Sequence, residues 1–424
     1  MLTSSNQNYT LGIDFGTSGA RGIALNRANV TVAATDYAFT IEALTQPHCW
    51  QAALYSIIEQ IPATIRQKIT AIAINGTSST VLLCDVGGQP LAAPLMYNDA
   101  RGVTTLAQIK AIAPPNHTVI SATSSLAKLL WLSQSESFTE AKYFLHQADW
   151  LAFLLHGKLG ISDYHNALKL GYDVEQLSYP SWLTQQNAIA SLLPHVVAPG
   201  TPIARVKPEI VTRFNLHAEC VVCAGTTDSI AAFIASGAKS PGEAVTSLGS
   251  TLVLKLLSRT RIENSQYGIY SHRLGDLWLT GGASNTGGAV LRKFFTDTEL
   301  QHLSAQIDPQ HPSPLDYYPL LQPGDRFPIN DPNLPPRLEP RPNDSVQFLH
   351  GLLESIARIE NQGYQLLQQL GATRLIRVYT AGGGAVNSTW QKIRARHLNV
   401  PLATPHSTAA AYGTAILAMQ GSDM

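Results

Sequence analysis

The sequence predicts an α/β protein of two domains, and three observations support this fold class. The chain has 424 residues, more than one hydrophobic core usually organises, so two domains of roughly 200 residues are expected. Apolar, β-branched runs alternate with segments whose apolar residues fall at helical spacing, as in α/β architectures. A turn of hydroxyl and glycine residues that leads into a strand occurs at 16–19 and again at 246–251, which suggests a duplicated domain.

The composition bears on the kind of partner. Lys plus Arg and Asp plus Glu both number 29, so no basic excess attracts nucleic acid or an anionic membrane. No apolar run approaches the ~20 residues of a membrane span, and the first nine residues lack the basic and apolar regions of a signal peptide. We therefore expect a cytoplasmic protein that binds small molecules, with no nucleic-acid or membrane partner. The sequence does not distinguish a monomer from a homodimer.

The chain opens on a predicted β-hairpin from Leu11 to Asn26, with apolar residues along both strands. Its turn, formed by Gly16, Thr17, Ser18 and Gly19, can direct backbone N–H groups and hydroxyls at an anion such as phosphate. Asp14, at the end of the first strand, is then placed to hold Mg²⁺ against those phosphates. An ordinary hairpin is the alternative, because Asp and Gly are common turn residues.

Helices and strands then alternate. Apolar residues from Trp50 to Ile61 fall on one helical face, and Ile69 to Ile74 is a predicted buried strand. The small polar residues at 75–80, Ser78 among them, follow the carboxyl end of that strand, where open α/β sheets bind ligands. A plain β-turn explains them equally well. A second hairpin is predicted around 85–88, and helices are predicted around Leu126–Leu130 and from Asp149 to Leu155, with His146 either a pocket residue or structural.

The loop at 94–101 carries groups that suit a sugar. Tyr97, Asp99 and Arg101 alternate along it. An aromatic ring can stack on a sugar face, while a carboxylate and a guanidinium can hydrogen-bond sugar hydroxyls. An exposed ion pair between Asp99 and Arg101 is the alternative.

The second half begins with a strand at 221–224 and a helix at 230–236. Asp228, between them, could cap the helix or could present a carboxylate that accepts a proton from a substrate hydroxyl. Cys220 and Cys223 have the spacing of a redox or zinc pair, but they lie in an apolar run where residues three apart point to opposite faces of a strand. We therefore expect no metal or redox role for them.

Eleven of the 25 prolines fall between 308 and 342, which predicts an extended segment. We expect it to pack on the second half through apolar anchors: Tyr317, Tyr318, Leu320, Leu321 and Phe327. After a long helix at 346–367 come a strand at 375–380, the glycines 382–384 and a helix capped by Asn387 or Ser388. A strand, a glycine turn and a helix N-terminus form a nucleotide-sized site, since backbone can approach the ligand and the helix dipole favours phosphate.

Six motifs occur in the order seen in the FGGY carbohydrate kinases, which belong to the actin-like ATPase superfamily. They are DFGTSGAR from Asp14, YNDAR from Tyr97, DWLAFLLHGKLGISDYHNA from Asp149, GTTDSIAAF from Gly225, SLGST from Ser247 and GGGAVNSTW from Gly382. The resemblance runs from about Leu11 to about Ala418 and implies two actin-like ATPase (ribonuclease H-like) domains that flank a central cleft. Residues 1–224, which a C-terminal helix at 406–424 could complete, would hold the sugar and phosphate loops. Residues 225–405 would bind the nucleotide.

The resemblance also implies roles for single residues, with ATP and Mg²⁺ as cofactors. Asp14 would position Mg²⁺ and phosphate, Thr17 would contact the transferred γ-phosphate, and Asp228 matches the catalytic base. Further nucleotide contacts are expected from these residues: Gly16, Ser18, Gly249, Ser250, Asn285, Gly383 and Asn387. Phe294 or Phe295 is expected beside them.

The expected sugar is a pentulose. Asp99 and Arg101 match the family's sugar loop, in which Tyr97 replaces the usual Trp. Classical xylulokinases carry a Met-His pair, and glycerol kinases a Gln-Arg-Glu set, where this chain has Gly76-Thr77-Ser78-Ser79. Ser78 is therefore a candidate contact to a sugar hydroxyl, together with Asp14 and Asp228.

The chain is similar to the compact cyanobacterial and plant branch called xylulose kinase-like. That similarity implies a D-ribulose kinase first and a D-xylulose kinase second. A nucleotide- or sugar-binding module without turnover is the alternative. No Walker A sequence occurs, so the chain is not a P-loop kinase.

Overall fold

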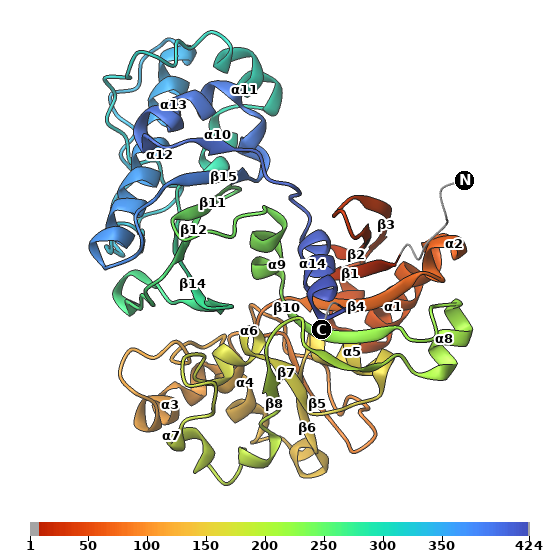
Figure 1. Cartoon of the computed structure of the whole chain (residues 1–424). Helices are drawn as coiled ribbons and strands as arrows, with labels where there is room; N and C mark the ends of the chain where they lie inside the picture. The colour runs from red at the N-terminus through yellow and green to blue at the C-terminus, as the bar shows by residue number, and fades with distance from the viewer. Residues whose placement is uncertain (1–7, 423–424) are drawn as a thin grey trace, which may run out of the picture. The chain divides into compact units, whose positions relative to one another are not determined.

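A computed structural model describes residues 8–422, and the chain divides into two units. The first unit has two segments, one that ends at Ala235 and one that begins at Ala409, and the second unit runs from Ser236 to Thr408 (Figure 1). The two units follow the same plan of a mixed sheet with helices packed on it. The fold is therefore α/β with two actin-like ATPase domains, as the sequence predicts.

The sheet of the first unit has the strand order β3-β2-β1-β4-β10-β9. Its strands are β1 (Tyr9–Phe15), β2 (Gly19–Asn26), β3 (Thr31–Ala38), β4 (Ile69–Gly76), β9 (Pro202–Arg205) and β10 (Val221–Thr227). β1, β2 and β3 form an antiparallel meander, while β4 is parallel to both β1 and β10. The predicted opening hairpin is confirmed, with Phe15 paired to Ala20 next to the turn.

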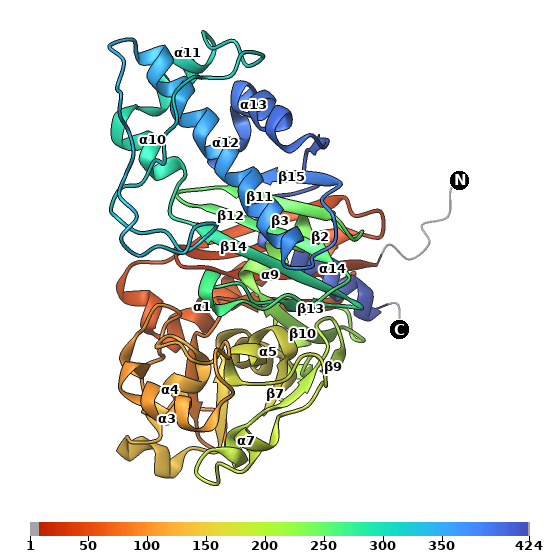
Figure 2. The same cartoon turned by 90° about the vertical axis from the view of Figure 1, so that its left-hand side faces the viewer.

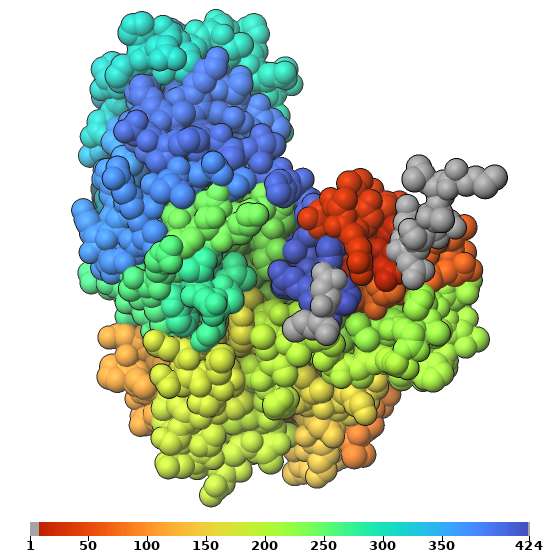
Figure 3. Space-filling model, in the orientation of Figure 1, coloured from red at the N-terminus to blue at the C-terminus, as the bar shows by residue number. Residues whose placement is uncertain are grey.

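Helices pack on both faces of this sheet because side chains alternate along β4. Ile72 and Ile74 join a core with α1 (Pro47–Gln60) and α5 (Gln147–His156), whereas Ala71 and Ala73 lie with α14 (Ala410–Ser422). α14 also packs along α9 (Asp228–Ala235) and against β1. Figure 3 shows α14, in blue, directly against the red N-terminal hairpin.

The approach of α14 to β1 requires a glycine. A Cβ at Gly12 would lie 2.1 Å from the carbonyl oxygen of Ala411. Two hydrogen bonds add to this contact, since Thr10 Oγ1 donates to the Ala415 carbonyl at 3.1 Å and Asn75 Nδ2 donates to Thr414 Oγ1 at 2.6 Å. The C-terminal helix is thus built into the first sheet.

Between β4 and β10 the chain forms a smaller lobe of the first unit. Antiparallel β5 (Val81–Cys84) and β6 (Tyr143–His146) form one short sheet, and parallel β7 (Ile161–Asp163) and β8 (His195–Val197) form another. α4 (Ser125–Leu132) packs beside the 3-10 helix η2 (Arg101–Thr105). The other α-helices of the first unit are α2 (Ala63–Arg66), α3 (Leu106–Ile112), α6 (Tyr164–Ala167), α7 (Ser181–Thr184) and α8 (Pro208–Phe214).

The sheet of the second unit has the order β13-β14-β12-β11-β15-β16. Its strands are β11 (Glu243–Leu248), β12 (Leu252–Ser258), β13 (His272–Leu274), β14 (Leu277–Ser284), β15 (Arg377–Ala381) and β16 (Leu402–Ala403). β11 and β12 form an antiparallel hairpin, β14 extends it, and β15 pairs with β11 in parallel. This repeats the plan of β1, β2, β3 and β4, so the duplication predicted from the two turns is present in the topology.

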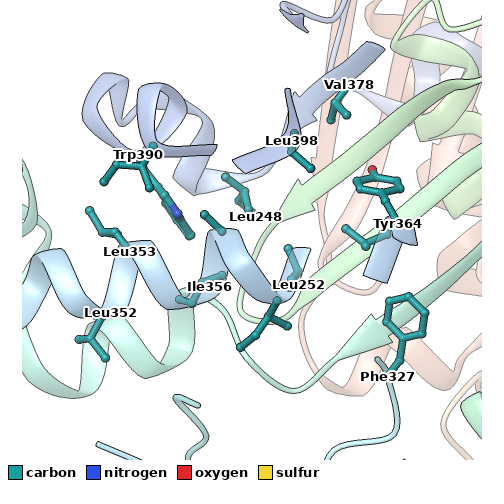
Figure 4. Packing of buried hydrophobic residues seen from close by; sticks show 14 of the residues in the cluster. Leu248, Leu252, Phe327, Leu352, Leu353, Ile356, Tyr364, Val378, Trp390 and Leu398 are labelled. Atoms are coloured by element: carbon teal, nitrogen blue, oxygen red, sulfur yellow. The ribbon is translucent and has the colours of Figure 1, made fainter. Parts of the chain in front are cut away.

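The core of the second unit forms between this sheet and a long helix, α12 (Ser345–Gln369), which crosses it (Figure 2). Leu352, Leu353 and Ile356 of α12 belong to one buried cluster with Leu248 and Leu252 at the β11–β12 turn (Figure 4). The remaining helices are α10 (Gly288–Phe294), α11 (Asp297–Ser304) and α13 (Ser388–Leu398).

The proline-rich segment is extended between α11 and α12, as predicted. Tyr317, Tyr318, Leu320 and Phe327 are buried anchors, but Leu321 is 37% exposed, so its expected burial is wrong. The chain is held to α12 at Tyr317, whose N–H donates to Ser355 Oγ at 3.1 Å. Along the described residues no helix is long and apolar enough to cross a membrane.

Candidate active site

The β1–β2 turn presents its polar residues to solvent. Gly16 N–H donates to the Gly19 carbonyl at 3.0 Å, which closes the turn, while Thr17 and Ser18 are exposed. The hydroxyls at the tip are therefore accessible to an anion. Contact of Thr17 with a phosphate stays a prediction.

Two carboxylates, one on a strand and one at the start of a helix, influence each other in the first unit. Asp14 is the last residue but one of β1, and Asp228 begins α9 directly after β10. Burial, followed by the negative charge of Asp228, raises the pKa of Asp14 to about 6. Arg21 and a hydrogen bond from Asn75 oppose this shift in the pKa. The sequence predicted both acids as site residues but did not predict that they interact.

The surroundings of Asp14 fit a cation. Its Oδ1 is buried and accepts no hydrogen bond from the described residues. A buried carboxylate oxygen without a donor is costly, and a hard cation such as Mg²⁺ would compensate it. Among the described residues, no group of three or more His, Cys, Asp and Glu side chains is placed to hold a metal ion. Asp14 therefore fits an ion that takes its other ligands from elsewhere.

Asp228 has features of both roles that the sequence left open. It is the first residue of α9, and its Oδ1 accepts a hydrogen bond of 2.7 Å from the Ser229 N–H. Its side chain is half-buried, and its negative charge raises the pKa of Asp14. The position at the helix start does not conflict with a role as base.

The loop around residues 96–101 contains the Asp99–Arg101 ion pair that the sequence offered as the alternative to a sugar contact, and the sugar contact itself stays a prediction. Arg101 Nε lies 3.0 and 2.9 Å from the two carboxylate oxygens of Asp99, and Nη2 lies 2.6 Å from Oδ2. The hydrogen bond from Arg101 lowers the pKa of Asp99. The Arg101 guanidinium also lies over the Trp131 ring, 4.7 Å from its centroid. Because Arg101 is about half exposed and Tyr97 is 44% exposed, the pair is available to a ligand.

The second unit contains a cavity of about 750 Å³. Its lining comes from the β11–β12 turn, α10, α11 and the segment 383–390, and it includes three residues predicted to bind the nucleotide, Gly249, Gly383 and Asn387. A volume of this order suits a nucleotide-sized ligand. Polar side chains that sequence reasoning missed also line it: Arg292, Asp297, Gln301 and Ser304. They lie on or next to α10 and α11, where no glycine or hydroxyl motif marks them.

Asn387 connects this cavity to a helix start. Its Oδ1 accepts from the Trp390 N–H at 2.9 Å, which confirms it as the N-cap of α13. Its Nδ2 donates to Ser304 Oγ at 2.8 Å. Upstream, Gly382 has φ 84°, and a Cβ there would lie 2.7 Å from the Leu248 carbonyl oxygen. Glycine is thus required where the two loops meet.

Four residues of the second unit that were expected at the nucleotide do not line this cavity, and neither do Gly16, Thr17 and Ser18 of the first unit. Asn285 is engaged elsewhere, because its Nδ2 donates to the Gly324 carbonyl at 2.9 Å and its N–H donates to Asp325 Oδ1 at 3.0 Å. Phe295 is buried in the core, and Phe294 packs edge-on against Phe348 with centroids 5.2 Å apart. Ser250 is exposed on the β11–β12 turn, where its carbonyl accepts from the Ala289 N–H.

His146 and the cysteine pair have structural surroundings. His146 is buried and forms a capping box with Asp149 at the start of α5, with Nδ1 3.1 Å from Asp149 Oδ2. Cys220 and Cys223 are free and buried, and burial raises the pKa of the Cys223 thiol to about 12. A thiol with this pKa is not a thiolate near neutral pH, and the expected lack of a redox role stays a prediction.

Two duplicated α/β domains, with a carboxylate pair in one and a nucleotide-sized cavity in the other, define a kinase of the actin-like ATPase class. Residues 9–235 match the N-terminal domain of the FGGY family of carbohydrate kinases, and residues 244–421 match its C-terminal domain. The chain belongs to this family and is an ATP-dependent carbohydrate kinase. The alternative of a binding module without turnover is thereby disfavoured.

Individual relatives are distant but cover almost the whole chain. The xylulose kinase of Bacillus subtilis is 23% identical over 98% of this chain and 88% of its own length. The structure of xylulose kinase from Rhodospirillum rubrum superposes with a TM-score of 0.84 at 20% identity, over 98% of this chain and 90% of that one. The structure of Plasmodium falciparum glycerol kinase with ADP superposes with a TM-score of 0.81 at 18% identity, over 99% of this chain and 90% of that one. These structures share the fold with this protein.

Proposed function

We propose that this kinase phosphorylates a pentulose, and that D-ribulose, converted to D-ribulose 5-phosphate, is the first candidate. The observation that carries the catalytic part is the Asp14–Asp228 pair, in which one acid is buried beside the charge of the other. The substrate part rests on the small side chains at 76–79, where classical xylulokinases carry larger groups. Ser78, Asp99 and Arg101 are the proposed sugar contacts.

The proposed mechanism is in-line transfer of the γ-phosphoryl group to a sugar hydroxyl. A neutral hydroxyl is a poor nucleophile, so Asp228 accepts its proton as the bond to phosphorus forms. Asp14 would hold the magnesium ion, which would supply positive charge against the phosphate oxygens. Thr17 and the turn around it donate hydrogen bonds to the transferred group as its charge develops.

The two units divide the substrates in this proposal. The first unit, with Asp14, Ser78, Asp99, Arg101 and Asp228, takes the sugar. The second unit takes ATP in the cavity lined by Gly249, Gly383 and Asn387, and the exposed Ser250 hydroxyl is a candidate phosphate contact. A glycine-rich turn beside the N-terminus of α13 favours an anion there.

D-Xylulose is the second candidate acceptor, and the comparisons favour it. Several relatives that cover most of this chain are named xylulose kinase, at 20 to 23% identity. Gluconokinase of Bacillus subtilis also matches, at 21% over 67% of the chain. Identity at this level does not fix a sugar, because discrimination between ketoses can depend on one hydroxyl.

The test is ADP release from Mg·ATP with separate acceptors: D-ribulose, D-xylulose, L-ribulose, gluconate, glycerol and no sugar. We expect the highest kcat/KM with D-ribulose and loss of turnover in Asp228→Ala. A higher kcat/KM with D-xylulose would replace the first candidate by the second. Turnover only with gluconate or glycerol would refute a pentulose kinase. ADP release that needs no sugar would refute the acceptor assignment.

A further inference from the structure

Lys128 on α4 is a buried lysine with no part in the mechanism above. Its relative exposure is zero. Its Nζ donates to three backbone carbonyls, those of Ser79 at 2.7 Å, Met96 at 2.6 Å and Tyr97 at 3.4 Å. Lysine is almost never fully buried unless its charge is compensated. Burial lowers the pKa of Lys128 to about 7, and in the protonated form its three N–H donors meet these three acceptors.

The three carbonyls belong to two loops, and both loops carry proposed sugar contacts. Ser79 directly follows Ser78, while Met96 and Tyr97 shortly precede Asp99 and Arg101. The first loop leaves β4 and the second leads into η2, so they are separate in sequence. Lys128 is therefore a direct link between the two halves of the proposed acceptor subsite.

The turn at Ser79 has an unfavourable local conformation. Its φ is 63°, in the left-handed region that residues other than glycine seldom adopt. Its hydroxyl is buried and has no hydrogen-bond partner among the described residues. The Ser79 side chain therefore does not stabilise this turn, whereas the hydrogen bond from Lys128 to the Ser79 carbonyl does.

Helix α4 contacts the second loop again through Trp131, which follows Lys128 by about one helical turn. The Arg101 guanidinium lies over the Trp131 ring. One face of α4 thus contacts the second loop twice. Lys128 binds backbone carbonyls of the loop, and the Trp131 ring packs against the Arg101 side chain. Arg101 is in turn paired with Asp99, so the contact extends to both sugar candidates.

We propose that Lys128 is a positioning residue of the acceptor subsite, which sets the spacing between Ser78 on one loop and Asp99 and Arg101 on the other. This inference rests on the proposed function, because that proposal assigns the two loops to the sugar. Lys128 acts through the backbone and has no contact with the transferred phosphoryl group. Its loss should therefore weaken sugar use and spare ATP use.

The experiment compares Lys128→Met with the wild type, using whichever acceptor the wild type phosphorylates best. Methionine keeps much of the length of the side chain and removes the charge and all three donors. We expect KM for the sugar to rise roughly 10- to 100-fold, because small displacements of positioning groups have effects of this size. KM for ATP should stay within about twofold. Lys110→Met on α3, where the lysine is exposed, is the matched control and should change neither value.

A second variant separates positioning from general damage. In Ser79→Gly/Lys128→Met, glycine adopts the left-handed conformation without strain and removes the unpaired hydroxyl, so the turn needs the lysine less. We expect the double variant to recover a substantial part of the lost sugar affinity. A rise in both KM values together, or a sugar KM equal to that of the wild type, would overturn the inference.

If Lys128→Met does not fold, Lys128→Arg decides the question. A guanidinium group is larger than an ammonium group and planar, so it cannot direct three donors at the same three carbonyls; we expect it to displace a loop and raise the sugar KM alone. A folded Lys128→Arg protein with wild-type sugar KM would also overturn the inference. Failure of the wild type to use any pentulose counts against the proposed function only, since the acceptor in this test is chosen by activity.

Discussion

Arg394 and Glu360 form an ion pair that is sealed from water in the core of the second unit. Arg394 Nε donates to Glu360 Oε2 at 2.6 Å and Nη2 donates to Oε1 at 2.7 Å, and the two side chains are 0% and 1% exposed. Thr246 Oγ1 donates to Glu360, and Arg394 Nη1 donates to Thr380 Oγ1. These threonines lie near the ends of β11 and β15, before the turns at 249–251 and 382–384. One ion pair thus braces both proposed nucleotide loops at their bases.

Glu360→Gln should destabilise the protein strongly, because it leaves the Arg394 charge buried without a counter-charge. Breaking one side of a buried pair costs about 3 to 5 kcal/mol in the free energy of unfolding. Urea denaturation at neutral pH measures it. The control is Glu219→Gln, which removes an exposed pair with Arg205 and should cost under about 1 kcal/mol. Equal losses in the two variants would contradict a special role for the buried pair.

Asp163→Asn should stabilise the protein in a pH-dependent way. Burial, and then the charge of Asp149, raises the pKa of Asp163 to about 7. A carboxyl whose pKa is raised on folding stabilises the folded state below its unfolded pKa near 4, and this contribution is lost as pH rises towards 7. The free energy of unfolding of the variant should therefore exceed that of the wild type at pH 8, by on the order of 2 to 4 kcal/mol, and equal it near pH 4.

The local hydrogen bonds permit this substitution. Asp163 Oδ1 accepts from the N–H groups of His165 and Asn166, as an asparagine oxygen can. Asn166 Oδ1 is buried without a partner among the described residues, so a turned Asn166 amide can accept from the new Nδ2. Denaturation at several pH values tests the prediction, with exposed Asp276→Asn as control. A variant that is less stable than the wild type at pH 8 would contradict it.

The sequence predicted the elements that combine regular periodicity with a clear boundary. The opening hairpin, the helix from residue 346 and the Asn387 cap were all marked by local signals, and their observed bounds differ by a few residues at most. β3 was missed because TVAATDYA has three polar residues and three small alanines, and the strand lies at the edge of its sheet with no buried residue. An edge strand of this kind has little apolar signature.

The site was predictable only where chemistry coincides with a motif. Gly249, Gly383 and Asn387 lie in glycine-rich turns and do line the cavity. Arg292 and Asp297 line it too, but nothing in the sequence separates them from ordinary surface charges. The role of Lys128 was equally hard to predict. An apolar helix with one lysine gives no sign that three backbone carbonyls from two other loops accept hydrogen bonds from that lysine. Such contacts depend on tertiary structure.

Asn387→Asp and Asn387→Ala should separate the two functions of Asn387. Aspartate can still cap α13, so its thermal stability should stay near that of the wild type, whereas alanine should cost about 1 kcal/mol. Both variants lose the hydrogen bond that Nδ2 donates to Ser304, and aspartate also adds a negative charge to the cavity lining. KM for ATP should therefore rise most in Asn387→Asp. An ATP KM that follows stability instead would contradict a nucleotide role.

Asp228→Asn distinguishes a catalytic base from a structural cap. The asparagine oxygen can keep the hydrogen bond from the Ser229 N–H, so α9 and the thermal stability should be preserved. The amide cannot accept the proton of the sugar hydroxyl, so kcat should fall roughly 10²- to 10⁴-fold while ATP binding remains.

Loss of the Asp228 charge should also lower the pKa of Asp14, because that charge is one of the causes that raise it. The control is Asp36→Asn, because Asp36 is an exposed residue of β3, and this variant should keep full turnover. Steady-state kinetics and calorimetric titration with ATP measure these effects. Near-normal kcat in a folded Asp228→Asn protein would leave Asp228 with the capping role alone, because a base cannot be replaced by a group that accepts no proton.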